Sequence, residues 1–212
     1  AQGRPDIAIK DSKTGELWQD NKGLEWIDPA SRIAWQYAAD IAQDMAQHGF
    51  DEVNFDYVRF PADGVIERLD FPFWTAVRPK YELIGTFFAY LNQELKNVGI
   101  ATSADIFGLA AWRAMDFTFD LNIGQRLIDA LPYFDYVSPM VYPSHYYSGL
   151  YLPKDPIRNL PAVSLNASGA RSKPDIVVGR SMLSARDFLD GKIGTSTLAY
   201  IPKTSSSTLE IV

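Results

Sequence analysis

A helix-length amphipathic stretch that runs directly into a short strand pattern is the feature that most constrains this chain of 212 residues. Gly49 follows the amphipathic stretch and is typical of the residue that ends a helix in a left-handed turn. From Val53 to Tyr57 apolar and polar residues alternate, as in a strand with two different faces. Pro61 cannot donate a hydrogen bond to a sheet, so the strand is predicted to end near Phe60.

The order of helix and then strand recurs along the chain, which is typical of a parallel sheet with crossover helices. The predicted helices cover residues 29–48, 80–97, 122–131 and 184–190, and the predicted strands cover 7–10, 52–57, 100–107, 134–142, 176–178 and 197–201. The region 152–173 is predicted to be a loop. The loop 62–79 carries several aromatic side chains, which either line a cleft or cover the end of the sheet.

The first of these helices is predicted to begin at Asp28, with its carboxylate as the N-cap. Ile33, Tyr37, Ile41 and Met45 recur every fourth residue, and Ala34, Ala38 and Ala42 fill the adjacent row, so these two rows are predicted to form the packed face of the helix.

Composition narrows the class of protein. The size and the apolar share of 47% fit one globular domain over residues 1–212. A net charge of −6 argues against a nucleic-acid partner, which would require a basic surface. The chain has no cysteine and two histidines, so no thiolate or histidine-rich metal site is expected. No apolar run has transmembrane length, and the first residues do not have the pattern of a signal peptide.

Three motifs carry a resemblance to a known family. The runs GFDEVNFDYVRFPADG, TSADIFG and DYVSPMVYPSHYYSG occur in this order over roughly residues 5–155. They resemble the putative glycosyl hydrolase domain family of bacterial proteins, which is placed among TIM-barrel glycosidases and is distantly similar to the α-amylase-type clan. The resemblance implies an α/β fold of the (β/α)8 TIM-barrel type. It also implies a carbohydrate substrate, no cofactor, and a location outside the cell or in the cell envelope.

About six strands are predicted, whereas a complete barrel has eight. We therefore expect a partial barrel, with about six of the eight β/α units and an atypical C-terminal section.

Two aspartates are the candidate catalytic groups. Asp56 and Asp105 lie near the carboxyl ends of consecutive predicted strands, and glycoside hydrolysis takes two carboxyl groups that flank the bond. By similarity to the α-amylase-type arrangement, Asp56 would be the nucleophile or charge stabiliser and Asp105 the proton donor. The clan has a glutamate at the donor position. The alternatives are an ion pair of Asp56 with Arg59 and a turn-capping role for Asp105.

Six further side chains are candidates for substrate binding. Arg59 can bind a sugar hydroxyl or an acidic substituent, and Trp112 can stack on a sugar ring. The remaining four candidates follow a strand end or the Asp56 position, and they are Tyr57, Met140, Tyr142 and His145.

These residues predict a hydrolase that cleaves a glycosidic bond in a polysaccharide. The alternative is a barrel that binds glycans without cleaving them, which the missing glutamate and the incomplete barrel favour. A metal-dependent hydrolase is disfavoured by the shortage of histidines.

Overall fold

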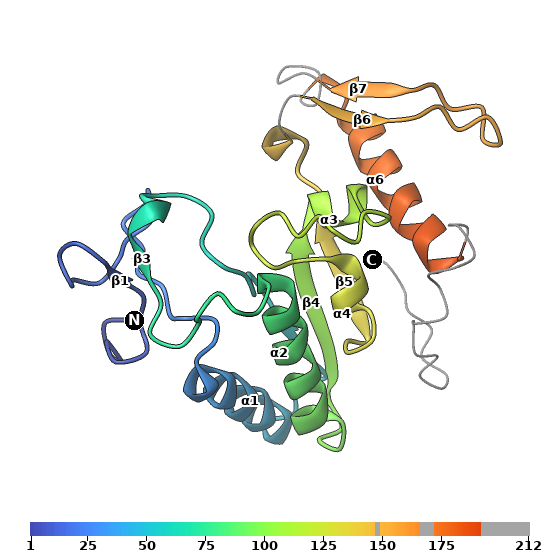
Figure 1. The fold of residues 1–212 in the computed structure, drawn as a ribbon. Helices are drawn as coiled ribbons and strands as arrows, with labels where there is room; N and C mark the ends of the chain where they lie inside the picture. The colour runs from blue at the N-terminus through green and yellow to red at the C-terminus, as the bar shows by residue number, and fades with distance from the viewer. Residues whose placement is uncertain (147–148, 166–171, 192–212) are drawn as a thin grey trace.

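The computed structural model describes residues 1–146, 149–165 and 172–191 (Figure 1). Its elements are, in chain order, β1 (Lys10–Asp11), α1 (Arg32–Gln47), β2 (Glu52–Phe55), η1 (Ile66–Arg68), β3 (Leu69–Asp70), α2 (Lys80–Leu95), β4 (Ala101–Phe107), α3 (Gly108–Trp112), α4 (Leu127–Ala130), β5 (Tyr136–Met140), η2 (Pro143–His145), β6 (Leu150–Leu152), β7 (Val163–Leu165) and α6 (Pro174–Leu189).

A parallel sheet of β2, β4 and β5, with β4 in the middle, lies at the centre of the molecule (Figure 1). Residues 52–55 of β2 pair with residues 101–104 of β4, and residues 103–107 of β4 pair with residues 136–140 of β5. A helix precedes each strand: α1 before β2, α2 before β4 and α4 before β5. The predicted parallel sheet with crossover helices is therefore confirmed.

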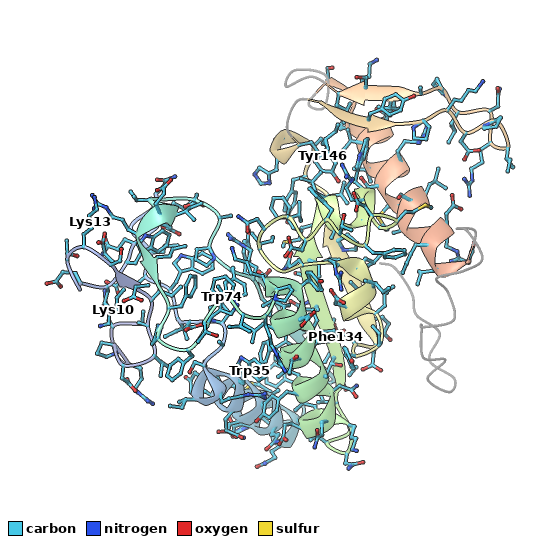
Figure 2. All side chains as sticks on the ribbon, viewed as in Figure 1. Lys10, Lys13, Trp35, Trp74, Phe134 and Tyr146 are labelled. Carbon is cyan, nitrogen blue, oxygen red and sulfur yellow. The ribbon has the colours of Figure 1, made fainter. Side chains whose placement is uncertain are left out.

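The two faces of this sheet differ in chemistry. Phe55, Ala104 and Val137 lie on one face and are buried in the main core, together with Phe88 of α2 and Phe134, whose ring is edge-on to that of Phe88 (Figure 2). The alternate residues of the same strands point the other way, and many of them are polar. One face of the sheet therefore supplies the core, and the other is left for polar side chains.

The described residues form a mixed α/β fold with a parallel sheet, but they do not show a TIM barrel, and no closed barrel is present among them. Three strands of this part of the chain join the parallel sheet, whereas about six β/α units were expected. The other strands form two separate antiparallel pairs, β1 with β3 and β6 with β7, at opposite ends of the molecule (Figure 1). β6 and β7 are joined by a connection without a helix, and such connections make antiparallel pairs.

The C-terminal section differs from the prediction at two places. Residues 176–178, predicted as a strand, lie inside α6, where Val177, Ser181, Ala185 and Phe188 are buried at helical spacing. The predicted loop at 152–173 contains the strand β7. The predicted strand at 197–201 lies outside the described residues. A short apolar run fits either a helix or a strand, and here the longer 3.6-residue period decides.

α1 begins later than predicted, and the face that it presents to the core differs in part from the predicted one. Its N-cap is Ser31, whose hydroxyl accepts a hydrogen bond from the Ala34 amide. The buried side chains are those of Trp35, Ala39 and Ala42. Of the predicted face, Ala42 is buried and Ala38 packs against the core, whereas Ile33, Tyr37 and Ile41 are exposed. An apolar row predicts which residues can pack, but the partner that covers them is a tertiary property.

Asp28, predicted as the helix cap, is fully buried and holds the loop 62–79 in place. Its Oδ2 accepts hydrogen bonds from the backbone amides of Phe73 (2.7 Å) and Trp74 (3.1 Å). Trp74 and Phe71 then pack edge-on against Phe60. These two aromatic side chains of the loop therefore cover the end of the sheet.

Gly108 is required where the turn after β4 meets the end of β5. A Cβ atom at this position would lie 2.4 Å from the backbone oxygen of Met140 and 2.7 Å from the Cα of Val141. Both contacts are with backbone atoms, which cannot move aside as a flexible side chain can. Any side chain at position 108 would push β4 and β5 apart.

We expect Gly108→Ala to lower the free energy of unfolding by about 1–3 kcal/mol, because the added methyl group overpacks the contact between the two strands. Urea unfolding followed by circular dichroism measures this loss. Gly179→Ala is the matched control, since a Cβ atom there has nothing within 4 Å and the position lies inside α6. Equal unfolding midpoints for Gly108→Ala and the wild type would contradict the predicted contact.

Candidate functional site

The sheet register brings Asp56 and Asp105 to the same level of neighbouring strands. Phe55, the last residue of β2, pairs with Ala104, so Asp56 follows directly beside Asp105. Asp105 pairs on its other side with Ser138 of β5. Neighbouring strands lie about 4.8 Å apart. Asp56 thus lies just beyond the end of β2, and Asp105 lies near the carboxyl end of the neighbouring strand β4.

Electrostatics couple the two carboxyl groups. Partial burial raises the pKa of Asp56, and a hydrogen bond from the Tyr57 backbone amide lowers it. The negative charge of Asp105 raises the same pKa, and the net effect is a raised value. Two neighbouring carboxylates repel one another, so a shared site favours keeping a proton on one of them. Asp56 therefore keeps its proton to a higher pH than an ordinary aspartate does.

A chain of hydrogen bonds along the polar face positions Asp105. Asn54 donates from its Nδ2 to Asp105 Oδ1 (3.1 Å) and to Ser103 Oγ (2.9 Å). The Ser103 hydroxyl in turn donates to the Glu52 carboxylate. Sequence reasoning assigned no role to Glu52 and Ser103. The signal that could have identified these residues is their alternation with apolar residues along the two strands.

A buried glutamine ties the two strand ends together. Gln125 is 1% exposed, donates to the Val58 backbone oxygen (3.0 Å) and accepts from the Phe107 amide (2.8 Å). Val58 lies two residues after Asp56, and Phe107 lies two residues after Asp105. Gln125 therefore holds the backbone segments that carry both aspartates. Nothing in the sequence singled it out, because only the fold brings residue 125 between the two strand ends.

The backbone turns sharply at Tyr57, which has φ = 53°. Few residues other than glycine adopt this left-handed conformation, and such backbone strain is concentrated at functional sites. The turn lies two residues beyond Phe55, the end of β2, and leaves Tyr57 about half exposed. The Tyr57 ring is thereby available to a ligand next to the carboxyl pair.

Arg59 does not pair with Asp56. Its guanidinium carbon lies 4.8 Å from the centre of the Trp26 ring and 5.5 Å from that of Tyr57, and its Nη1 donates to the Phe60 oxygen. Burial lowers the pKa of Arg59, although a guanidinium keeps its charge at any physiological pH. The ion pair considered as an alternative role for Asp56 is therefore absent.

A cleft of about 480 Å³ runs along the outer side of β2. Asp56, Tyr57 and Arg59 line it on one side, and Trp26 lines it from the segment before α1. Asn54 also lines this cleft. The Asp56 position therefore adjoins both the cleft and the neighbouring strand that carries Asp105.

A second group of aromatic side chains lies at the carboxyl ends of β4 and β5. The Phe107 and His145 rings are stacked at 6.5 Å, and His145 meets Tyr142 edge-on at 5.4 Å. Tyr142 and His145 are exposed, and Met140 pairs in register with Phe107. The structure thus brings three of the predicted binding residues, Met140, Tyr142 and His145, together beside the strand that carries Asp105.

Trp112 does not belong to this site. Its side chain is 1% exposed and packs edge-on against Tyr146, which is labelled in Figure 2, in the cluster between α3 and α6. Trp112 therefore cannot serve as the predicted sugar-stacking platform, because its ring has no accessible face. An aromatic residue shortly after a candidate catalytic residue fits a binding platform or a core position equally well, and here α6 covers it.

In the part of the chain that the structure describes, no three histidine, cysteine, aspartate or glutamate side chains are grouped so as to hold a metal ion. None of the described helices has the length and apolar character needed to cross a membrane. The site thus offers the carboxyl groups of Asp56 and Asp105, with the Tyr57 ring and the Arg59 guanidinium near Asp56.

Comparisons with known proteins agree with the three motifs. A family model described as "Putative glycosyl hydrolase domain" matches residues 1–201. A search of curated proteins found no match. A crystal structure of a hypothetical protein from Ruminiclostridium thermocellum ATCC 27405 is 36% identical to this chain, with a TM-score of 0.42, and the match covers 49% of this chain and 50% of that one. The chain thus spans about half the length of that protein. Because the family model covers nearly the whole sequence, the chain belongs to the putative glycosyl hydrolase domain family.

Proposed function

We propose that this protein hydrolyses a glycosidic bond in a polysaccharide, with Asp56 as proton donor and Asp105 as nucleophile. The observation that carries the proposal is the position of Asp56 beside Asp105, together with the raised pKa of Asp56. A pair of carboxyl groups in which one keeps its proton is the combination that glycoside hydrolysis requires. Membership of the family supports the reaction class.

The reaction would proceed in two steps. In the first, Asp56 transfers its proton to the glycosidic oxygen while the bond from this oxygen to the anomeric carbon breaks and the Asp105 carboxylate bonds to that carbon. In the second, Asp56 removes a proton from water, and the resulting hydroxyl group displaces Asp105 from the sugar. Both carboxyl groups then return to their starting states, and no cofactor is needed.

The other side chains of the site would hold the sugar. Tyr57 and Tyr142 offer exposed aromatic faces on opposite sides of the carboxyl pair, and such faces pack against sugar rings. His145 can exchange hydrogen bonds with hydroxyl groups. A polysaccharide substrate also fits a place in the cell envelope or outside the cell.

A glycan-binding module without activity is the second candidate. The observation that favours it is the exposure of Asp56, because a site open to solvent excludes little water from the reaction. The two candidates predict the same ligands and differ only in cleavage.

A cleavage assay distinguishes the hydrolase from the glycan-binding module. On a panel of oligosaccharides followed by release of reducing ends, we expect Asp56→Asn and Asp105→Asn each to lower kcat/KM by about 100- to 10,000-fold, since each removes a group that acts in the transition state. Asp51→Asn is the matched control, because Asp51 is an exposed aspartate at the other end of β2. Cleavage that survives both substitutions, or wild-type protein that binds glycans and cleaves none, would exclude the hydrolase.

The shared proton predicts a pH dependence. Activity should fall as the pH rises through the raised pKa of Asp56, because the donor then loses its proton. The Asp105→Asn substitution removes the charge of Asp105 and should therefore lower the pKa of Asp56. The pKa should stay above that of an ordinary aspartate, because burial is the largest cause of the shift. A carbon NMR titration of the Asp56 carboxyl group measures both pKa values without needing activity. An unchanged pKa in Asp105→Asn would show that the two groups are not coupled.

The strand spacing predicts the stereochemistry. The backbones of neighbouring strands lie about 4.8 Å apart. Carboxyl groups carried by such strands can therefore approach the separation of about 5–5.5 Å found in retaining enzymes. We therefore expect the first product to keep the anomeric configuration of the substrate. Proton NMR of the product, recorded before mutarotation, reads this directly, and an inverted product would require a water molecule between the two groups.

A further inference from the structure

The guanidinium of Arg59 is a partly buried positive charge that no carboxylate of the described residues neutralises by an ion pair. None of the ion pairs in this part of the chain includes it, and its Nε is buried without a hydrogen-bond partner there. Arginine is the residue that proteins use to bind a carboxylate through two parallel hydrogen bonds. A half-buried arginine of this kind beside a cleft is suited to receive an anion.

The acidic residues nearest to it are occupied by other donors. Asp20 accepts hydrogen bonds from the backbone amides of Lys22 and Leu24 and from the Trp26 indole. Asp63 accepts from the Asn21 amide. The negative charges of both carboxylates raise the pKa of Arg59 by electrostatic attraction, without an ion pair. Their hydrogen bonds keep them in their own turns, so the anion that would pair with Arg59 has to come from a ligand.

Two aromatic rings frame the guanidinium. Trp26 is oriented by the hydrogen bond from its indole nitrogen to Asp20 Oδ2 (3.1 Å), and its ring centre lies 4.8 Å from the Arg59 carbon. Tyr57 lies on the strained turn that follows Asp56, with its ring centre at 5.5 Å. Trp26, Tyr57 and Arg59 all line the cleft that Asp56 adjoins. Aromatic faces pack against sugar rings, and the guanidinium between them selects a charged substituent.

We propose that Trp26, Tyr57 and Arg59 form a subsite for a sugar that bears a carboxylate, so that the substrate is an acidic glycan containing uronic acid residues. This deepens the proposed hydrolase and rests on it for the reaction, but not for binding. The acidic net charge of the protein repels such a ligand at long range, so the local contacts of Arg59 have to supply the affinity.

NMR of the intact chain tests the subsite. The indole signals of the five tryptophans are recorded while methyl glucuronide or methyl glucoside is added to millimolar concentration, and Trp26→Phe assigns the Trp26 signal. We expect the glucuronide to shift the Trp26 signal in a saturable manner and to bind at least about tenfold more tightly than the glucoside, as a charged hydrogen-bond pair provides.

Substitution of the arginine separates its charge from its shape. Arg59→Gln should remove the preference for the glucuronide, and Arg59→Lys should keep only part of it, because lysine offers a point charge without the planar fork. Arg32→Gln is the matched control, since Arg32 also lies over a tryptophan ring, that of Trp35 at 3.9 Å. Its preference should equal that of the wild type.

Two results would overturn the proposal: equal shifts with both sugars, or a preference that survives in Arg59→Gln. The titration involves no cleavage, so its outcome is independent of the hydrolase test. A protein that prefers the glucuronide and cleaves no glycan would retain this subsite and lose only the proposed reaction.

Discussion

The parallel pairing of β2 with β4 is the interaction on which the site depends. Backbone hydrogen bonds fix which residues stand opposite one another, and a shift by one residue would turn every side chain to the other face. In the observed register the last pair, Phe55 and Ala104, enters the core, and Asp56 and Asp105 are the residues that follow this pair on the two segments. The hydrophobic face of the sheet therefore determines, through its register, that two carboxyl groups meet at its end.

Bringing two carboxyl groups together costs free energy, because each disfavours ionisation of the other. Several contacts hold them against this repulsion. Gln125 bonds the backbone beyond both strand ends, and Asn54 bonds Asp105 directly. Gly108 lets β5 lie close against the turn after β4. Gln125, which is 1% exposed, holds the backbone at Val58, directly after the left-handed turn at Tyr57.

The surroundings of the pair are uneven. On the β2 side lie a cleft and a guanidinium framed by two rings, and on the β5 side lie Phe107, Tyr142 and His145. In the arrangement that we propose, the acidic sugar of a glycan would lie next to Asp56, on the side of Arg59.

Local patterns in the sequence determined the helix–strand units, the parallel sheet, and the placement of Asp56 and Asp105 at strand ends. The reason is that apolar alternation and turn residues act over a few positions. Tertiary structure alone decided that three strands of the described residues pair in parallel, that Trp112 is covered by α6, and that Ile33, Tyr37 and Ile41 of α1 are left exposed. It also decided that Arg59 faces Trp26 instead of Asp56 and that Gln125 reaches both strand ends. These contacts join residues that lie tens of positions apart, and no short-range pattern specifies which distant partner a side chain will meet.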